Sequence, residues 1–354
     1  MTHDASTRGD RVTAGDGGTS VSTAGASAPH GGQGATSVAG ASEAGATPRD
    51  ATALVVGEAL IDVVERADGL REAHPGGSPA NVALGLGRLG RSVALATWLG
   101  DDAEGDLVRR HLAESAVRVL DGNRTAFRTP VATAHLDAQG VATYEFDLEW
   151  DLADAWTDEP AAPVVVHTGS IAAVLEPGAP KVRRLVERHR GTATITYDPN
   201  LRPALMGSPA LARPHVEAMV GLADVVKVSD EDLAWLEPGV APAEIAEEWC
   251  RLGPALVVVT HGGEGAFAAT SAGARLRVTA PRVEVADTVG AGDSFMGGLV
   301  DGLWSAGLLG AHRRRALHDA EVATLEAVLA RCARIAAITV SRAGANPPWS
   351  AELG

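Results

Sequence analysis

From residue 53 onward, short continuous apolar runs alternate with longer stretches that have helical spacing. The apolar runs, which we predict to be buried strands, cover residues 53–57, 93–96, 164–166, 193–197, 225–226 and 256–259. The intervening stretches, which we predict to be helices, cover residues 79–89, 105–116, 181–189 and 243–252. Strands that are apolar at successive positions are buried on both faces, as in a mainly parallel sheet covered by helices. The pattern therefore predicts an α/β fold.

Two sections, residues 61–75 and 118–151, depart from this rhythm. In both, Thr, Val, Tyr and Phe alternate with polar residues, and residues 137–140 (Asp-Ala-Gln-Gly) carry a turn signal. Such alternation is typical of antiparallel hairpins with one solvated face. We predict a small β-sheet that projects from the α/β body as a lid over a site. A solvent-facing hairpin without such a role would have the same pattern.

Residues 1–50 have a different composition from the rest of the chain. They consist largely of Gly, Ala, Ser and Thr with scattered charges, and contain no Leu, Ile, Phe, Tyr or Trp. A segment of this kind cannot bury enough apolar surface to offset its ordering entropy. We therefore expect a disordered tail over residues 1–50 and a folded domain over residues 51–354.

Composition narrows the function classes. Of the 354 residues 45% are hydrophobic, and the formal net charge is −15. So acidic a chain is a poor general binder of nucleic acid or anionic membrane. It has no apolar run long enough to span a bilayer and no secretory signal. Its two cysteines, Cys250 and Cys332, encode neither a disulfide framework nor a zinc site. We expect a cytoplasmic enzyme that acts on a small molecule.

The segment with the most chemical information covers residues 287–298, Asp-Thr-Val-Gly-Ala-Gly-Asp-Ser-Phe-Met-Gly-Gly. Apolar residues continue at helical spacing after Gly292, which places the glycines at a helix N-terminus. Unpaired backbone N–H groups and the helix dipole can hold an anion there. Asp293, in the first turn, could accept a proton from an incoming hydroxyl. The alternative is a tight turn with Asp293 as N-cap.

A second glycine-rich helix entrance covers residues 74–83, His-Pro-Gly-Gly-Ser-Pro-Ala-Asn-Val-Ala. Ser78 suits a helix cap and Pro79 the first helical position. Asn81 offers the donor and the acceptor that a polyol needs. A capped helix with a surface amide is the structural alternative.

Together these two segments resemble the signature regions of the ribokinase-like, or phosphofructokinase-B type, carbohydrate kinases. The likeness covers roughly residues 53–350, in the same order and with a similar separation. It implies a three-layer α/β/α sandwich with a mainly parallel sheet and a small β lid. It also implies transfer of the γ-phosphoryl group of ATP, with Mg²⁺, to a hydroxymethyl group of a sugar.

The resemblance also assigns roles to individual residues. Asp293 takes the position of the family's base. Positions that match the anion hole are Gly290, Ala291 and Gly292. Positions that match contacts to sugar hydroxyls are Asp62, Gly76, Gly77 and Asn81.

Residues 198–202, Asp-Pro-Asn-Leu-Arg, follow a predicted strand at the carboxyl edge, where open α/β sheets bind ligands. They resemble the family's Asp-Pro-Asn-x-Arg segment, which implies that Asn200 and Arg202 contact phosphate or substrate. The alternative is an Asp-Pro turn with an exposed arginine.

Residues 227–232, Lys-Val-Ser-Asp-Glu-Asp, lie where many relatives carry Asn-x-x-Glu to organise magnesium. In this chain Ser229 and Asp232 have that spacing, so the pattern departs from the common one. The resemblance implies that Lys227 and Ser229 contact the nucleotide and that Asp232 serves hydrated Mg²⁺. The competing explanation is that these acidic residues stabilise the N-terminus of a helix through its dipole.

Two further loops resemble the family's nucleotide site. Residues 260–265, Thr-His-Gly-Gly-Glu-Gly, are similar to its Thr-x-Gly-x-x-Gly loop and imply contacts from Thr260, Gly262 and Gly265; a glycine turn between two strands is the alternative. Residues 341–347 resemble the loop over adenine and imply a contact from Asn346. With Asp287, Ser341 marks a candidate site for K⁺. The chain has no Walker-type P-loop motif.

Residues 198–202 and 341–347 resemble those of bacterial fructokinases, which makes fructose the leading substrate. However, residues 146–151 carry acids and Trp150 where a fructokinase often has arginine. Ribose, adenosine and 2-keto-3-deoxygluconate stay open as substrates, and so does a sugar-binding regulator without catalysis. We expect the lid to take part in substrate selection through Trp150, and it is a candidate surface for a homodimer.

Overall fold

The structure, a computed structural model, describes residues 51–66, 68–120, 122, 125–136, 142–156, 158–160 and 162–354. The tail expected at residues 1–50 and the turn expected at residues 137–140 lie outside the described residues. The strands, helices and contacts given below are all formed by the described residues.

A nine-stranded sheet forms the centre of the body, in the order β13-β12-β11-β10-β9-β8-β1-β4-β5. Its strands are β1 (Thr52–Val56), β4 (Ser92–Ala96), β5 (Val117–Leu120), β8 (Val165–Gly169), β9 (Thr194–Asp198), β10 (Val225–Ser229), β11 (Leu256–Thr260), β12 (Ala266–Thr270) and β13 (Arg275–Val278). All neighbours are parallel except β11–β12 and β12–β13, which are antiparallel. Each predicted apolar run corresponds to one of these strands.

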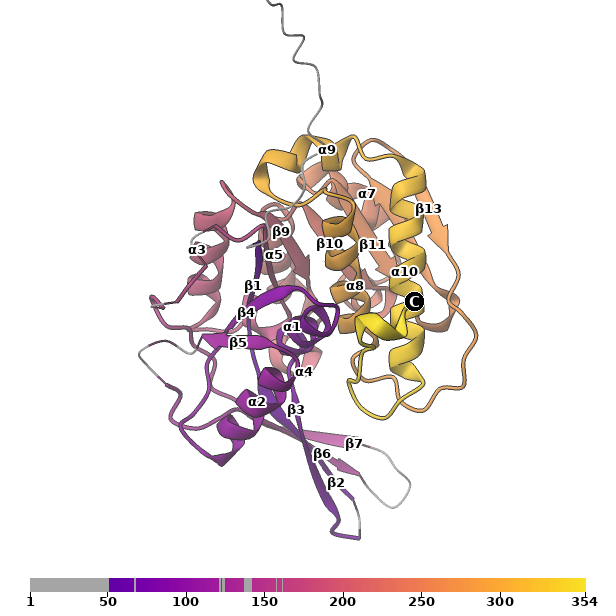
Figure 1. Cartoon of the computed structure of the whole chain (residues 1–354). Coiled ribbons are helices and arrows are strands. Elements are labelled where there is room, and N and C mark those ends of the chain that lie inside the picture. The colour runs from indigo at the N-terminus through magenta and orange to yellow at the C-terminus, as the bar shows by residue number, and fades with distance from the viewer. Residues whose placement is uncertain are drawn as a thin grey trace, which may run out of the picture. The chain divides into compact units, whose positions relative to one another are not determined.

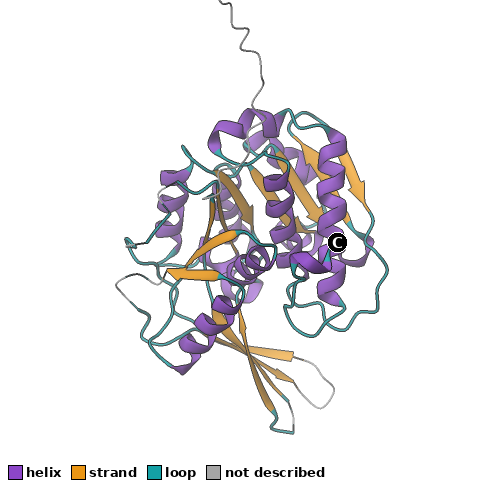
Figure 2. Ribbon diagram, viewed as in Figure 1, coloured by secondary structure: helices purple, strands orange, loops and turns teal. Residues whose placement is uncertain are grey.

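Helices cover both faces of the sheet (Figures 1 and 2). One face carries α3 (Ala179–His189), α5 (Pro209–Val220), α6 (Asp230–Leu236) and α7 (Pro242–Leu252), and the other carries α1 (Ser78–Arg88), α2 (Ala103–Glu114), α8 (Ala291–Ser305) and α10 (Val322–Val340). Leu54 and Val56 of β1 belong to the first core, and Ala53 and Val55 belong to the second. Because successive side chains of a strand point to opposite faces, this division confirms the three-layer α/β/α fold.

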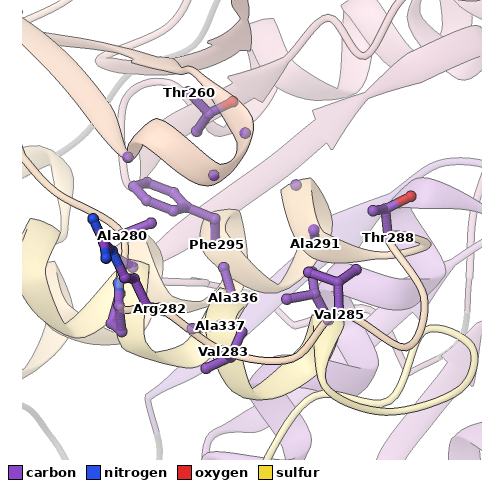
Figure 3. Close-up of a pocket in the computed structure, with 17 residues that line it drawn as sticks. Thr260, Ala280, Arg282, Val283, Val285, Thr288, Ala291, Phe295, Ala336 and Ala337 are labelled. Carbon is purple, nitrogen blue, oxygen red and sulfur yellow. The ribbon is translucent and has the colours of Figure 1, made fainter.

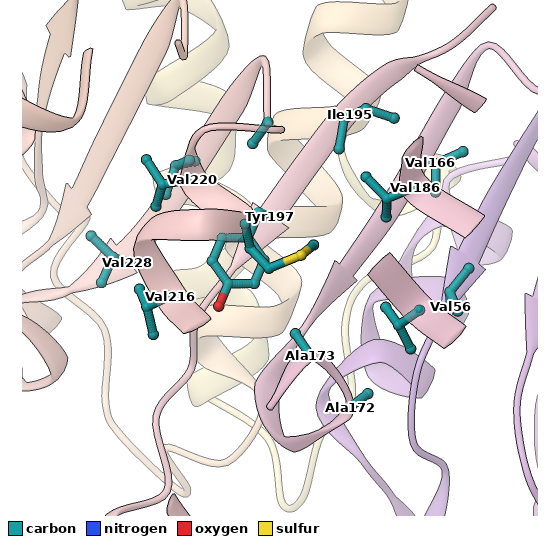
Figure 4. Close-up of a cluster of buried hydrophobic side chains, with 14 of the residues drawn as sticks. Val56, Val166, Ala172, Ala173, Val186, Ile195, Tyr197, Val216, Val220 and Val228 are labelled. Carbon is teal, nitrogen blue, oxygen red and sulfur yellow. The ribbon is translucent and has the colours of Figure 1, made fainter. Parts of the chain in front are cut away.

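The first core anchors the end of β9, where the site begins. Tyr197 is fully buried, and Figure 4 shows its ring among side chains that include Val216 of α5 and Val228 of β10. A buried aromatic ring of this size contributes strongly to core packing. Asp198, the next residue, is therefore held firmly at the carboxyl edge of the sheet.

A separate four-stranded sheet projects from the body, in the order β3-β2-β6-β7 (Figure 1). Its strands are β2 (Leu60–Glu65), β3 (Arg71–Gly76), β6 (Val131–Leu136) and β7 (Ala142–Asp147). The pairs β2–β3 and β6–β7 are antiparallel hairpins, while β2 and β6 are parallel. At the base of the sheet Ile61 and Val63 are buried in the core that contains α2. We call this sheet the lid.

The ends of the second predicted lid segment belong to the body instead. Residues 118–120 lie in β5 at the edge of the large sheet, and residues 148–151 follow β7. Trp150 is 3% exposed, and its Nε1 donates a hydrogen bond to the Ala172 carbonyl oxygen at 3.1 Å. The expectation that Trp150 selects the sugar from the lid is wrong, because its ring is buried in the first core.

The shorter helices connect these elements. They are α4 (Pro203–Met206), α9 (Arg314–His318) and the 3₁₀ turns η1 (Ser170–Ala173), η2 (Gly262–Glu264), η3 (Ala311–Arg313) and η4 (Ser350–Glu352). Cys250 and Cys332 are buried and free. No helix in the described ranges is long and apolar enough to cross a membrane.

Candidate active site

The first turn of α8 is built around Gly290. This residue caps the helix with φ of +74°, and a Cβ atom at this position would lie 2.6 Å from the Cβ of Ala345. Only glycine meets both conditions without strain. Because Gly290 is the N-cap, the alternative that Asp293 caps the helix is excluded; Asp293 lies within the first turn and is 8% exposed.

Two side chains from the start of α1 orient the Asp293 carboxylate. The Ser78 hydroxyl donates to Oδ1 at 2.7 Å, and the Asn81 amide nitrogen donates to Oδ2 at 2.8 Å. The two glycine-rich segments therefore meet in space. Ser78 is not the helix cap that we expected, because Gly77 holds that position. Asn81, predicted to contact sugar, contacts the carboxylate of the predicted base.

Asp62 of β2 faces Asp293 from the lid side. Gly76 permits this arrangement, because a Cβ atom there would lie 2.0 Å from Asp62 Oδ2. The residue is exposed to solvent, although its carboxyl group lies among protein atoms that partly desolvate it. This partial burial raises the pKa of Asp62 to about 6; the positive charge of Arg202 opposes the shift, and the negative charge of Asp293 adds to it. Gly76, Asp62 and Asp293 thus lie near one another, and their roles in substrate binding and catalysis stay predictions.

The loop after β9 brings Arg202 to the same place. Its Nη1 donates to Asn200 Oδ1 at 2.8 Å and to the Asn200 carbonyl oxygen at 3.0 Å. Asn200 itself has φ of +36°, a conformation that asparagine tolerates better than most residues. The Arg202 charge acts on both Asp62 and Glu58. Arg202 therefore lies near Glu58 and Asp62, and Asn200 fixes the position of its guanidinium group.

Glu58 is a site residue that sequence reasoning missed. It follows β1 and is 3% exposed, and its Oε2 accepts a hydrogen bond from the Ala172 N–H at 3.3 Å. Burial raises the pKa of Glu58 to about 7, although a Ser170 hydrogen bond and the Arg202 charge oppose the shift. An acid directly after a buried strand, at the carboxyl edge of the sheet, was the signal that could have found it.

A cavity of about 510 Å³ lies on the other side of the α8 turn (Figure 3). Its size suits a small organic ligand. The lining residues are Thr260, Gly262, Gly263, Gly265, Ala280, Pro281, Arg282, Val283, Val285, Thr288, Ala291, Gly292, Phe295, Ala333, Ala336, Ala337 and Val340. Ala291 and Gly292 of the predicted anion hole line this cavity, and so do Ala333, Ala336 and Ala337 of α10, the helix that packs against α8. The loop at residues 260–265 joins strands β11 and β12, as the alternative of a glycine turn between two strands requires. It also lines the cavity.

The architecture and this arrangement of segments agree with comparison to known proteins. Residues 50–352 match the family described as pfkB family carbohydrate kinase. The chain belongs to this family. The kinase is also 34% identical over 269 residues to a fructokinase of Rhizobium leguminosarum bv. trifolii, a match that spans 72% of this chain and 81% of the relative.

Solved structures agree with this assignment. A fructokinase of Xylella fastidiosa with bound ATP superposes with a TM-score of 0.73 at 25% identity, over 85% of this chain and 96% of that one. A double mutant of a Vibrio cholerae fructokinase, bound to fructose, ADP and a potassium ion, gives a TM-score of 0.68 at 26% identity, over 83% and 94%. The predicted family and enzyme class, a carbohydrate kinase, are confirmed.

Three residues predicted to contact the nucleotide do not line the cavity. Lys227 Nζ pairs with Asp198 Oδ2 at 2.9 Å beside the α8 turn. Ser229 caps α6, where its hydroxyl accepts from the Asp232 N–H. Asn346 Oδ1 accepts from Arg88 Nη1 at 2.5 Å, which holds this amide away from the cavity lining. In each case the side chain forms a hydrogen bond or ion pair with another residue of the protein.

The predicted metal positions have structural partners. Asp232 Oδ1 accepts from the Leu201 N–H at 2.9 Å and its Oδ2 from the Ser229 N–H at 3.4 Å, which agrees with the helix-capping alternative. Asp287 accepts from the N–H groups of Val289 and Gly344, and the Ser341 hydroxyl donates to the Ile338 carbonyl oxygen. In the part of the chain that the structure describes, no group of three or more His, Cys, Asp or Glu side chains forms a metal site. The metal roles stay predictions.

The buried Glu58 carboxyl predicts a pH dependence of stability. Its pKa rises from 4.5 to about 7 on folding, so the folded state binds this proton more tightly than the unfolded chain. The stabilising contribution is complete below pH ~4.5 and is lost as the pH rises through ~7, by about 3 kcal/mol. Glu58→Gln, which keeps the hydrogen-bond acceptor, should lose far less stability between pH 5 and 8 than the wild type. Urea unfolding at both pH values measures this, and parallel losses in the two proteins would contradict it.

Proposed function

We propose that this kinase transfers the γ-phosphoryl group of ATP to a hydroxymethyl group of fructose. In this proposal Asp293 is the general base, and the backbone N–H groups of residues 290–292 form the anion hole. The observation that carries the proposal is the position of the α8 turn. It lines the cavity, and it also carries a carboxylate held by Ser78 and Asn81. This carboxylate lies near Asp62 and Arg202, in the region that we call the acceptor side because the proposed sugar would bind there.

The geometry supports a direct transfer between the two sides of this turn. Adenosine in the cavity would direct its phosphates toward Gly292 and the N-terminus of α8, where N–H groups and the helix dipole favour anions. Asp293 would accept the proton of the attacking hydroxyl, while the N–H groups stabilise charge on the transferring group. Mg²⁺ bound to the phosphates would neutralise part of their charge.

The charges on the acceptor side favour an uncharged sugar. Asp62 and Asp293 bring two carboxyl groups to this region, and Glu58, with a pKa of about 7, adds a third that is only partly ionised at neutral pH; Arg202 and His74 oppose them. A sugar acid such as 2-keto-3-deoxygluconate would meet net negative charge, whereas a neutral polyol offers hydroxyl donors to the carboxylates. Fructose is the neutral sugar named for the most similar relatives reported above. A sugar-binding regulator is disfavoured, because a binder has no need of a carboxylate beside an anion hole.

A substrate panel tests this proposal. Initial rates with Mg-ATP should be measured for fructose, ribose, adenosine and 2-keto-3-deoxygluconate at several concentrations of each. We expect the highest kcat/KM for fructose. A higher kcat/KM for adenosine or for the sugar acid would overturn the choice of substrate while leaving the kinase assignment in place.

Two accessory features belong to the same proposal. The proposed K⁺ site lies at Asp287 and Ser341, where Asp287 accepts hydrogen bonds from the N–H groups of Val289 and Gly344. The Vibrio cholerae fructokinase that carries a potassium ion supports this choice. The lid is the proposed surface for a homodimer, since Leu70 beside it is 51% exposed.

The raised pKa of Asp62 predicts that sugar binding weakens in acid. Above pH ~6 the carboxylate accepts hydrogen bonds from sugar hydroxyls, and protonation below this pH removes the charge that strengthens them. Losing about 1 kcal/mol of binding would raise KM for the sugar roughly fivefold between pH 7.5 and 5.5. Asp62→Asn should show a raised KM that no longer depends on pH in this range. If KM of Asp62→Asn depended on pH in the same way as KM of the wild type, another group would be responsible for the pH dependence.

A further inference from the structure

A buried ion pair lies at the carboxyl edge of the sheet, between the neighbouring strands β9 and β10. Lys227 Nζ and Asp198 Oδ2 are 2.9 Å apart, and the two side chains are 3% and 0% exposed. Removing both charges from water is expensive, and the attraction between them often does not repay that cost. The position of the pair therefore needs an explanation.

The ammonium group of Lys227 lies against the first turn of α8. A Cβ atom at position 292 would lie 2.8 Å from Nζ, so no atom separates the lysine from the backbone of Gly292. Gly292 also lines the cavity. The charge of Lys227 interacts with Asp293 as well as with Asp198. The lysine thus sits beside the point where the cavity, the proposed anion hole and the proposed base meet.

Asp198 differs from the buried acids that hold the fold together. Asp224 accepts at both oxygens, from Arg314 Nε at 2.5 Å and from the Ile195 N–H at 2.8 Å. Asp301 likewise accepts from Arg91 at Oδ1 and from Arg331 at Oδ2. Asp198 Oδ1, in contrast, is buried without a hydrogen-bond partner in the described part of the protein. An unsatisfied buried acceptor costs stability, and such groups often have a functional role.

The protonation states fit a fixed positive charge. Burial lowers the pKa of Lys227, but the carboxylates of Asp198, Asp232 and Asp293 outweigh this effect, and the net pKa is raised. Lys227 therefore keeps its proton at neutral pH. Burial raises the pKa of Asp198 to about 6, against the opposing charge of Lys227, so this carboxyl is ionised above that pH.

We propose that Asp198 is a positioning residue for phosphoryl transfer: it holds the Lys227 ammonium against Gly292, where the charge stabilises the transferring phosphoryl group. The inference rests on the proposed function and adds a part to it. The bond from the γ-phosphorus to the bridging oxygen breaks, the substrate oxygen bonds to that phosphorus, its proton passes to Asp293, and ADP leaves. Lys227 contributes charge and keeps all its protons.

A double-mutant cycle on kcat tests this arrangement. Lys227→Met should lower kcat by roughly 10²–10³-fold, the usual effect of removing one such stabilising group. Asp198→Asn should lower kcat at least about tenfold, with KM for the sugar nearly unchanged. Because Asp198 acts through Lys227, the double variant should be no more than about threefold slower than Lys227→Met. The proposal would be overturned if the double variant lost kcat by the product of the two single-variant factors. Near-normal kcat in either single variant would also overturn it.

Asp224→Asn is the matched control. Asp224 directly precedes β10, at the amino end of the strand, whereas Asp198 lies at the carboxyl end of β9. Like Asp198, it is buried in an ion pair. Asp224→Asn should lose stability but keep kcat within about threefold. If Asp198→Asn does not fold, Lys227→Arg takes its place: this variant keeps the charge and should recover most of the activity that Lys227→Met loses. Activity no better with arginine than with methionine would contradict a role for charge.

Calorimetric titration with ATP and with AMP separates this inference from the proposed function. Lys227→Met should reduce the ratio of ATP affinity to AMP affinity at least about tenfold, because AMP lacks the phosphates that reach the α8 turn. An unchanged ratio would overturn the inference. If the wild type consumes no ATP with any sugar, the proposed function fails, while the affinity ratio still decides the role of Lys227.

Discussion

Asp293→Asn is expected to abolish most turnover while the protein stays folded. The substitution keeps the size of the side chain, and an amide can still accept one hydrogen bond from Ser78 or Asn81. It removes the carboxylate that would take the substrate proton. General-base catalysis contributes roughly 10²–10⁴-fold, so kcat should fall by that factor. Binding of ATP and sugar should change little, because their other contacts persist.

Two measurements accompany this prediction. The affinities of Asp293→Asn for ATP and sugar show whether binding persists, and a second variant, Asn81→Asp, tests the carboxylate through its neighbour. A second carboxylate beside Asp293 would raise the proton affinity of the pair, so activity should fall at neutral pH and recover partly at higher pH. Near-normal kcat in Asp293→Asn would show that this carboxylate is not the base.

Filling the cavity from α10 is expected to block the nucleotide without affecting the sugar. Ala337 is buried in the cavity wall on the face of α10 that also carries Ala333 and Val340. A phenylalanine there would occupy space that the proposed nucleotide base needs. We expect Ala337→Phe to raise KM for ATP by about 10–100-fold, equivalent to roughly 1.4–2.8 kcal/mol, with fructose affinity nearly unchanged.

Ala330→Phe is the matched control, since Ala330 lies on the same helix but is exposed and does not line the cavity. It should leave KM for ATP within about twofold of the wild type. Equal effects of the two substitutions would indicate a general disturbance of α10. Normal ATP kinetics in Ala337→Phe would place the nucleotide elsewhere.

Six strands of the body (β1, β4, β8, β9, β10 and β11) could be predicted because their burial on both faces appears directly as continuous apolar runs. β9 and β11 are examples, with all or nearly all residues buried. β13 was not predicted, because this short edge strand, Arg-Leu-Arg-Val, buries only Leu276 fully. Its pattern is too short and too polar to identify without its neighbour. α5 was missed as well, since Pro214 interrupts the helical pattern.

Tertiary contacts explain what the sequence could not predict in the site. Ser78 and Asp293 are 215 positions apart, and nothing in either segment specifies that a hydroxyl of one donates to a carboxylate of the other. Resemblance to a family brought the two segments together, but it did not indicate this hydrogen bond. Asp198 was passed over because an Asp-Pro sequence also suits an ordinary turn.

Trp150 illustrates the opposite error. Its segment continues the alternation of β7, so sequence reasoning extended the lid to Asp151. The strand ends at Asp147, and the chain then returns to the body. Alternation predicts a strand with two different faces, but it does not indicate where the chain leaves the sheet or which side chains the body buries.

Phosphoryl transfer to a sugar with Asp293 as the base is tested most directly by following the fate of phosphorus during one reaction. Wild-type protein should be incubated with Mg-ATP and fructose and monitored by ³¹P NMR, with Asp293→Asn measured in parallel. We expect one sugar monophosphate for each ADP formed by the wild type, with phosphorus on a hydroxymethyl oxygen, and almost no product from the variant. ADP that accumulates with inorganic phosphate instead, or equal product from both proteins, would contradict it.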